Sequence, residues 1–201
     1  MLWFAQFAFS MSMMVINFAM PVYAVTVLGL PGWVTGAVFT INTIMVGLGQ
    51  GLAVRAMTGR VRWRILVLAN LFFAASFVIL LGATVVGIAV AVAVVLVGSV
   101  VYTLGELTGG PVTSALAAEA APEHLRGRYL SMIQLAWSVS GTIAPLAFAW
   151  LLDRGETVIW VALLGLTLLG VGVSTLLGRV LPLAADRVTN TAAEAIDGAV
   201  L

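Results

Sequence analysis

The residue best suited to chemistry in this sequence is Glu106, a carboxylic acid in the middle of a long apolar run. If that run crosses a membrane, the roughly 15 residues from Glu106 to Ala120 cover roughly 22 Å at about 1.5 Å per residue. Half of a hydrocarbon core is about 15 Å thick, so the acid would lie deep in the bilayer. An acid at that depth costs on the order of 3 kcal/mol. We therefore expect Glu106 to bind a proton or a ligand, since the apolar runs offer it no basic partner.

Other polar residues recur at helical spacing on the same run and on three further apolar runs. Ser99, Thr103, Glu106 and Thr113 follow one another at three- and four-residue steps or their multiples, so they share one helix face. This pattern predicts that four apolar runs line a polar cavity, namely the first, second, fourth and fifth (residues 2–28, 33–54, 88–121 and 129–152). The third and sixth runs (residues 65–81 and 157–181) are expected to face lipid. The expected cavity contacts are Gln6, Asn17, Asn42, Tyr102, Thr103, Gln134 and Trp137. The alternative is that such side chains only form hydrogen bonds between helices.

A proline follows Glu106 closely and predicts a bend in the same helix. Pro111, preceded by Gly109 and Gly110, lacks a backbone donor and frees the carbonyl of Leu107. Bent helices near the middle of the membrane are places where transporters tend to bind their substrates. We therefore expect the bend to lie at Gly110 and Pro111.

The composition identifies a membrane protein and excludes several other classes. Of 201 residues, 62% are hydrophobic and 8% are charged, whereas a soluble domain has roughly a quarter of its residues charged. The net charge of +1 offers no basic face for nucleic acid. Cysteine is absent, which excludes disulfides and thiolate metal sites, and the one histidine, His124, is expected in a solvated loop. With no catalytic pair or metal-ligand cluster inside the apolar runs, we expect no enzyme, no metal and no cofactor.

The apolar runs divide the chain into an all-α membrane domain of six transmembrane helices, residues 1–182. The runs are continuous rather than alternating, which excludes a β-barrel. The expected spans are 2–28, 33–54, 65–81, 88–121, 129–152 and 157–181. Residues 183–201 lack periodicity and are expected to be a disordered cytoplasmic tail.

The arginines predict the orientation of these spans. With the basic loop of residues 55–64 placed inside, Arg154 is the one arginine outside. The expected inside set is Arg55, Arg60, Arg62, Arg64, Arg126, Arg128, Arg179 and Arg187. Because positive residues favour the cytoplasmic side, both chain ends are expected in the cytoplasm. The first span has no basic residue before it, so Met1 is expected to mark a truncated or internal start.

The stretch around Glu106 also resembles a known family. The string LGELTGGPVTSALAAEAAPEHLRGRY, followed by GTIAP, is similar to helices ten and eleven of the major facilitator superfamily, in particular of bacterial drug:proton antiporter-like members. The matching positions are Gly105, Glu106, Pro111, Ala121, Pro122, Arg126, Gly127, Arg128 and Tyr129. The preceding loop, GLAVRAMTGRVRWR, resembles the family's loop between helices eight and nine but lacks its aspartate.

The resemblance implies half of a twelve-helix major-facilitator bundle, a 3+3 inverted repeat that forms the C-terminal half of a transporter. Such a half would move a small molecule, such as a drug-like compound, across a bacterial cytoplasmic (inner) membrane by alternating access, as a proton-coupled efflux antiporter. Its partners would be the substrate, protons, the lipid bilayer and an N-terminal six-helix half. Glu106 would couple protons or contact substrate, and Glu119 with Arg126 and Arg128 would form a cytoplasmic latch.

A non-transporting fragment or an accessory subunit of a split transporter remains the alternative. An upstream reading frame that encodes six more helices would favour the transporter.

Overall fold

The computed structural model describes residues 2–119, 121–181 and 186–188, and these residues are almost entirely helical. Apart from one isolated β-bridge between Val61 and Arg187, the described part of the chain contains no strand pairing. The long helices are α1 (Leu2–Met13), α3 (Trp33–Met57), α4 (Arg62–Leu81), α5 (Ile88–Glu119), α6 (Arg126–Arg154) and α7 (Glu156–Leu177). The predicted all-α class is therefore confirmed.

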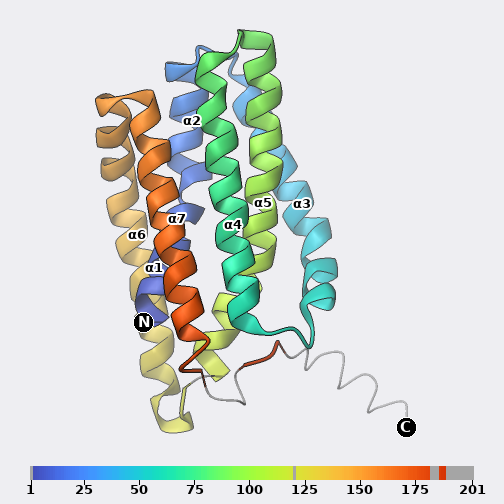
Figure 1. Cartoon of the computed structure of the whole chain (residues 1–201), viewed down its shortest axis with the longest axis vertical. Helices are drawn as coiled ribbons and strands as arrows, with labels where there is room; N and C mark the ends of the chain where they lie inside the picture. The colour runs from blue at the N-terminus through green and yellow to red at the C-terminus, as the bar shows by residue number, and fades with distance from the viewer. Residues whose placement is uncertain (1, 120, 182–185, 189–201) are drawn as a thin grey trace.

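Six helical stretches are long enough and apolar enough to cross a membrane, which confirms the expected number of spans. They are Leu2–Val27, Trp33–Met57, Arg62–Val85, Ile88–Leu116, Glu123–Arg154 and Glu156–Leu177. A helix needs about 20 apolar residues to cross a hydrocarbon core of about 30 Å. Successive helices run in opposite directions, so the loops gather at the two ends of the bundle (Figure 1).

The first span is irregular, which the sequence analysis did not predict. After α1 it continues as a π-helical turn, Val15–Ala19, a short α-helix, α2 (Met20–Val22), and a second π-helical turn, Tyr23–Val27. Pro21 lies at the start of α2, where its missing N–H can be tolerated. Wider turns of this kind are frequent at functional sites of helices.

The helix α4 is the centre of the described bundle, since it packs between α5 and α7 (Figure 1). The helix α1 packs against α6 and α7. By contrast α3 packs mainly against α5, and its buried residues are Val34, Val38 and Met57. The third span therefore has helix neighbours on two sides, while Leu68, Leu71 and Val78 leave another of its faces exposed, so the expectation that it faces lipid stays a prediction for that face.

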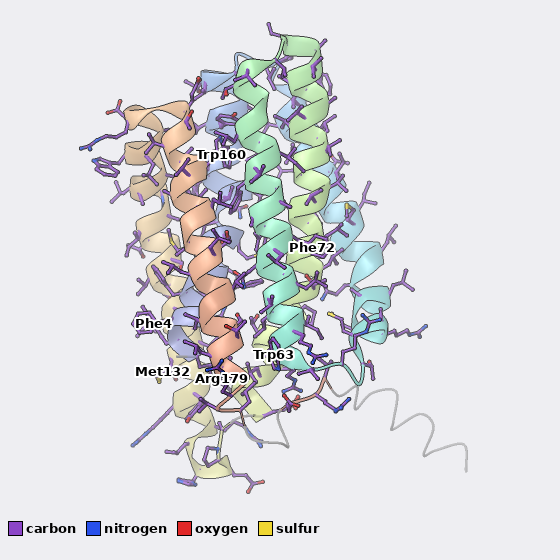
Figure 2. All side chains as sticks on the ribbon, viewed as in Figure 1. Phe4, Trp63, Phe72, Met132, Trp160 and Arg179 are labelled. Atoms are coloured by element: carbon purple, nitrogen blue, oxygen red, sulfur yellow. The ribbon has the colours of Figure 1, made fainter. Side chains whose placement is uncertain are left out.

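Aromatic rings fill the core on both sides of α4. The Phe73 ring lies 5.0 Å from that of Tyr102 on α5, and the Phe77 ring lies 5.9 Å from that of Trp160 on α7 (centroid distances). Tyr23 meets Trp160 edge to face at 4.7 Å. Figure 2 shows Trp160 in the half of α7 opposite the end where Trp63 and Arg179 lie. Inside a membrane such packing, rather than removal of apolar surface from water, holds helices together.

The chain after α7 returns to the loop between α3 and α4. The backbone N–H of Gly59 donates to the carbonyl of Val188 (2.8 Å), and that of Val188 donates to the carbonyl of Arg60 (3.0 Å). Val188 is buried in a cluster with Met57 and Leu177. Asp186–Val188 is the described part of the segment that was expected to be disordered, and it is paired with this loop. Residues 183–185 and 189–201 lie outside the described residues.

Candidate functional site

Glu106 forms a hydrogen bond with an amide on a neighbouring helix. The Nδ2 atom of Asn42, on α3, donates to Oε2 of Glu106, on α5, across 2.7 Å. The same nitrogen donates to Oγ1 of Thr103 across 3.1 Å. An amide nitrogen carries two hydrogens, so Asn42 can make both bonds at once. Glu106 and Thr103 are three residues apart on one face of α5, which is why a single side chain reaches both.

Thr103 is held in place from its own helix. Its hydroxyl donates to the carbonyl of Ser99 across 2.8 Å, which leaves the oxygen free to accept from Asn42. Thr103 is fully buried, whereas Glu106 and Asn42 are only partly buried. The cluster of Asn42, Thr103 and Glu106 is therefore anchored on α5 and retains one accessible side.

No basic residue pairs with Glu106 in the part of the chain that the structure describes. The salt bridge found there joins Arg62 and Glu119. An ionised carboxylate inside a membrane needs a countercharge or several donors, and here the donor given by the structure is one neutral amide. A carboxyl group in this setting is suited to carrying a proton or to meeting a cation.

Tyr102 connects the same stretch of α5 to the first span. Its buried hydroxyl lies 3.0 Å from the carbonyl oxygen of Ser12 and 2.9 Å from that of Met13. Both carbonyls lie where α1 gives way to the π-helical turn Val15–Ala19. Tyr102 therefore acts as a donor to the irregular point of the first span.

A pair of serines connects the first span to α6. The hydroxyls of Ser10 and Ser140 lie 2.6 Å apart, and both residues are fully buried. With the contacts of Asn42 and Tyr102, this bond joins the first span, α3, α5 and α6, the four spans that the polar residues indicated. Ser140 was not among the predicted residues, because it lies on another face of α6 from Gln134 and Ser138.

Three of the predicted cavity residues lie apart from these bonds. Asn17 is exposed, and its Nδ2 lies 3.5 Å from the carbonyl of Met13 on its own helix. Gln134 is exposed on α6, and Trp137 is partly buried against the aromatic core. The structure brings none of the three into hydrogen-bond contact with Glu106.

Gln6 lies in a separate small cavity of about 10 Å³. Asn70 of α4, Thr113 of α5 and Ser174 of α7 also line it. Gln6 is 2% exposed, and its Nε2 has no hydrogen-bond partner among the described residues. A space of this size holds about one water molecule. Gln6 therefore lines a space too small for a drug-sized substrate.

Glu119, the predicted latch acid, forms an ion pair with an arginine outside the predicted set. Glu119 pairs with Arg62, which begins α4 and is 1% exposed. Arg126 and Arg128 begin α6 and are both exposed. In the sequence, Arg62 was marked only by its place in the basic loop. Its pairing with Glu119 could not be predicted, because the sequence does not show that the end of α5 lies beside the start of α4.

The predicted bend falls inside an unbroken helix. Pro111 lies within α5, whose bounds run from Ile88 to Glu119 without interruption. A Cβ atom added at Gly110 would meet nothing within 4 Å, so this side of α5 is open. The described residues include no group of three possible metal ligands.

Six membrane-crossing helices with a hydrogen-bonded acid on one of them define a multi-pass helical membrane protein. A comparison with family models matches the Major Facilitator Superfamily over residues 2–196. The chain therefore belongs to the major facilitator superfamily, whose members are transporters, and its six helices fit one half of the superfamily's bundle. No curated protein and no solved structure matches the chain.

Proposed function

We propose that the chain forms the C-terminal half of a proton-coupled secondary transporter, in which Glu106 carries the proton. The observation that supports this most directly is the partly buried carboxyl group of Glu106. It is bonded to Asn42 and has no basic partner among the described residues. A group of this kind can exchange a proton each time the cavity opens to water.

In this proposal the two oxygens of Glu106 have different tasks. Oε2 accepts from Asn42, which fixes the plane of the carboxyl group. The proton would then be carried on Oε1, the oxygen that Asn42 leaves available. Thr103, which accepts from the same amide, holds Asn42 in position when the charge of Glu106 changes.

The substrate would be a small molecule, such as a drug-like compound, that enters between this half and an N-terminal six-helix half. Asn17, Gln134 and Trp137 would contact it, since each is exposed or partly exposed. The transporter would lie in a bacterial inner membrane, with both termini in the cytoplasm, and act in efflux. Arg126 and Arg128, both exposed, would form a cytoplasmic latch together with Glu119.

Replacement of Glu106 by glutamine tests the coupling role. Glu106→Gln keeps the shape and the acceptor for Asn42 but cannot release a proton. We expect the variant, assembled with an N-terminal half, to fold with a stability change below about 1 kcal/mol and still to bind substrate. Uphill transport driven by a pH gradient should be lost. Accumulation of substrate in vesicles with an imposed pH gradient measures this.

Glu156→Gln is the matched control, because Glu156 is an exposed acid at the start of α7. This variant should transport as the unaltered protein does. If Glu106→Gln concentrates substrate at the unaltered rate, while Glu106→Leu destabilises the bundle, Glu106 has a structural role. That outcome would remove the coupling role of Glu106, whereas absence of transport by the unaltered protein assembled with an N-terminal half would favour a non-transporting accessory subunit.

A further inference from the structure

A pocket of about 450 Å³ lies at the loop between α3 and α4, away from the Glu106 cluster. Its lining includes the arginines Arg60, Arg64 and Arg187 and the apolar residues Val61, Ile65 and Leu68. No acidic residue is part of this lining. The pocket thus combines a positively charged wall with an apolar one.

The three arginines are held near one another by the backbone. The β-bridge between Val61 and Arg187 places the segment after α7 beside the loop. Nη1 of Arg187 donates to the carbonyl of Gly59 across 2.8 Å, which leaves the other guanidinium hydrogens available. The guanidinium carbon of Arg64 lies 5.4 Å from the ring centroid of Trp63. None of the three arginines has a carboxylate partner among the described residues.

The apolar wall belongs to the part of α4 that enters the membrane. Arg62–Val85 is one of the six membrane-crossing stretches, and Ile65 and Leu68 lie in its first two turns. Leu68 is 42% exposed, and further up the helix Leu71 and Val78 are also exposed. Figure 2 shows Trp63 at the same end of the bundle as Arg179. Tryptophan and arginine at a helix end are typical of the boundary between headgroups and hydrocarbon.

We propose that this pocket binds an anionic phospholipid, with its phosphate among Arg60, Arg64 and Arg187 and its acyl chain along Leu68, Leu71 and Val78. Guanidinium groups bind phosphate oxygens through pairs of parallel hydrogen bonds. Basic pockets between transmembrane helices are known to bind anionic headgroups. The apolar stripe favours a lipid over a free anion, because a free anion would leave it without a partner.

Lipid titration of the whole purified chain in detergent tests the proposal, with bound lipid counted by native mass spectrometry. Phosphatidylglycerol should bind more tightly than phosphatidylcholine. Each of Arg60→Gln, Arg64→Gln and Arg187→Gln should weaken phosphatidylglycerol about fivefold, the change that corresponds to about 1 kcal/mol per arginine. The triple variant should lose the preference for phosphatidylglycerol.

Arg154→Gln is the matched control, since Arg154 also lies over a tryptophan ring, that of Trp150, at 4.1 Å, but is the last residue of α6 and does not line the pocket. It should leave the preference unchanged. The triple change to lysine keeps the charge but not the paired hydrogen bonds, so it should bind phosphatidylglycerol more weakly than the unaltered chain and more tightly than the triple glutamine variant, which separates loss of the site from loss of the fold.

Three results would overturn the proposal. They are equal binding of both lipids, an equal loss in Arg154→Gln, and displacement of phosphatidylglycerol by millimolar inorganic phosphate alone, which would indicate a free-anion site. The measurement needs neither substrate nor transport, so its outcome is independent of the role proposed for Glu106.

Discussion

Tyr102 combines packing and hydrogen bonding in a way that makes its hydroxyl separable from its ring. The ring packs on Phe73, and the hydroxyl lies within bonding distance of two carbonyls at the end of α1. A change to phenylalanine therefore removes the hydrogen bonds of the hydroxyl and keeps the packing of the ring. This substitution therefore measures how much stability the irregular first span gains from its hydrogen bonds with α5.

We expect Tyr102→Phe to lower the stability of the bundle by roughly 0.6 kcal/mol, the average for hydrogen bonds between membrane helices, and by at most roughly 1.7 kcal/mol. Unfolding of the purified chain in mixed detergent measures this. Tyr129→Phe is the control, because the structure gives Tyr129, at the start of α6, no side-chain hydrogen bond among the described residues. Equal stability of the two variants would show that the Tyr102 hydroxyl does not support the first span.

Only part of the candidate site could be predicted from residue spacing. The three-residue step from Thr103 to Glu106 placed both on one face, because helical periodicity is local. The partner Asn42 was chosen as polar, but its bond to Glu106 spans 64 positions in the sequence and depends on how α3 lies on α5. The pairing of Arg62 with Glu119 could not be predicted for the same reason.

At the scale of helices, α5 owes its close contacts to small residues. A Cβ atom at Gly109 would overlap the ring of Phe9 on α1, and one at Gly105 would lie 3.1 Å from the carbonyl of Ala69 on α4. The adjacent Gly110 faces open space. Small residues at such contacts let helices approach closely in a membrane.

This contrast predicts opposite outcomes for two neighbouring substitutions. Gly109→Ala should destabilise the bundle by about 1 to 3 kcal/mol, because the added methyl group displaces the Phe9 ring. Gly110→Ala should be neutral or stabilising, since alanine favours a helix by about 1 kcal/mol relative to glycine. The unfolding midpoints of both variants in detergent measure these two changes in stability. A loss of similar size in both would mean that helix geometry at Pro111, not the Phe9 contact, determines the effect.

The helices themselves were predictable because long apolar runs and few charges leave little choice of structure in a membrane. The π-helical turns of the first span were not, since Pro21 was the one signal of irregularity and a proline does not specify a wide turn. The placement of α4 at the centre was also missed. Its scarcity of polar residues suggested contact with lipid, which stays a prediction for the face that carries Leu68, Leu71 and Val78, but did not indicate that its aromatic residues pack against α5 and α7.

At the scale of the molecule, the two ends of the bundle differ in charge. Thr58 lies in the basic loop between α3 and α4, and Glu156 begins α7 at the opposite end (Figure 1). Both residues are exposed. From the positive-inside bias we predict that the first end faces the cytoplasm.

Cysteine labelling tests this orientation, because the chain has no cysteine of its own. In intact cells an impermeant thiol reagent should label Glu156→Cys and leave Thr58→Cys unmodified until the cells are opened. The reverse pattern would invert the orientation. Both variants should be labelled after permeabilisation, which controls for their reactivity.

The position of α3 connects the charge of Glu106 to the mobility of a whole helix. Since α3 packs mainly against α5, the bonds from Asn42 to Glu106 and Thr103 are part of what holds α3 in place. A hydrogen bond to an ionised carboxylate is roughly twice as strong as one to a neutral acid. Release of the proton should therefore raise the protection of the α3 amides, measured as hydrogen–deuterium exchange relative to the intrinsic rate at each pH, and Glu106→Gln should abolish that rise. Exchange in α7 should be the same in both proteins. The proton on Glu106 would then control how firmly α3 is held, independently of the rest of the bundle.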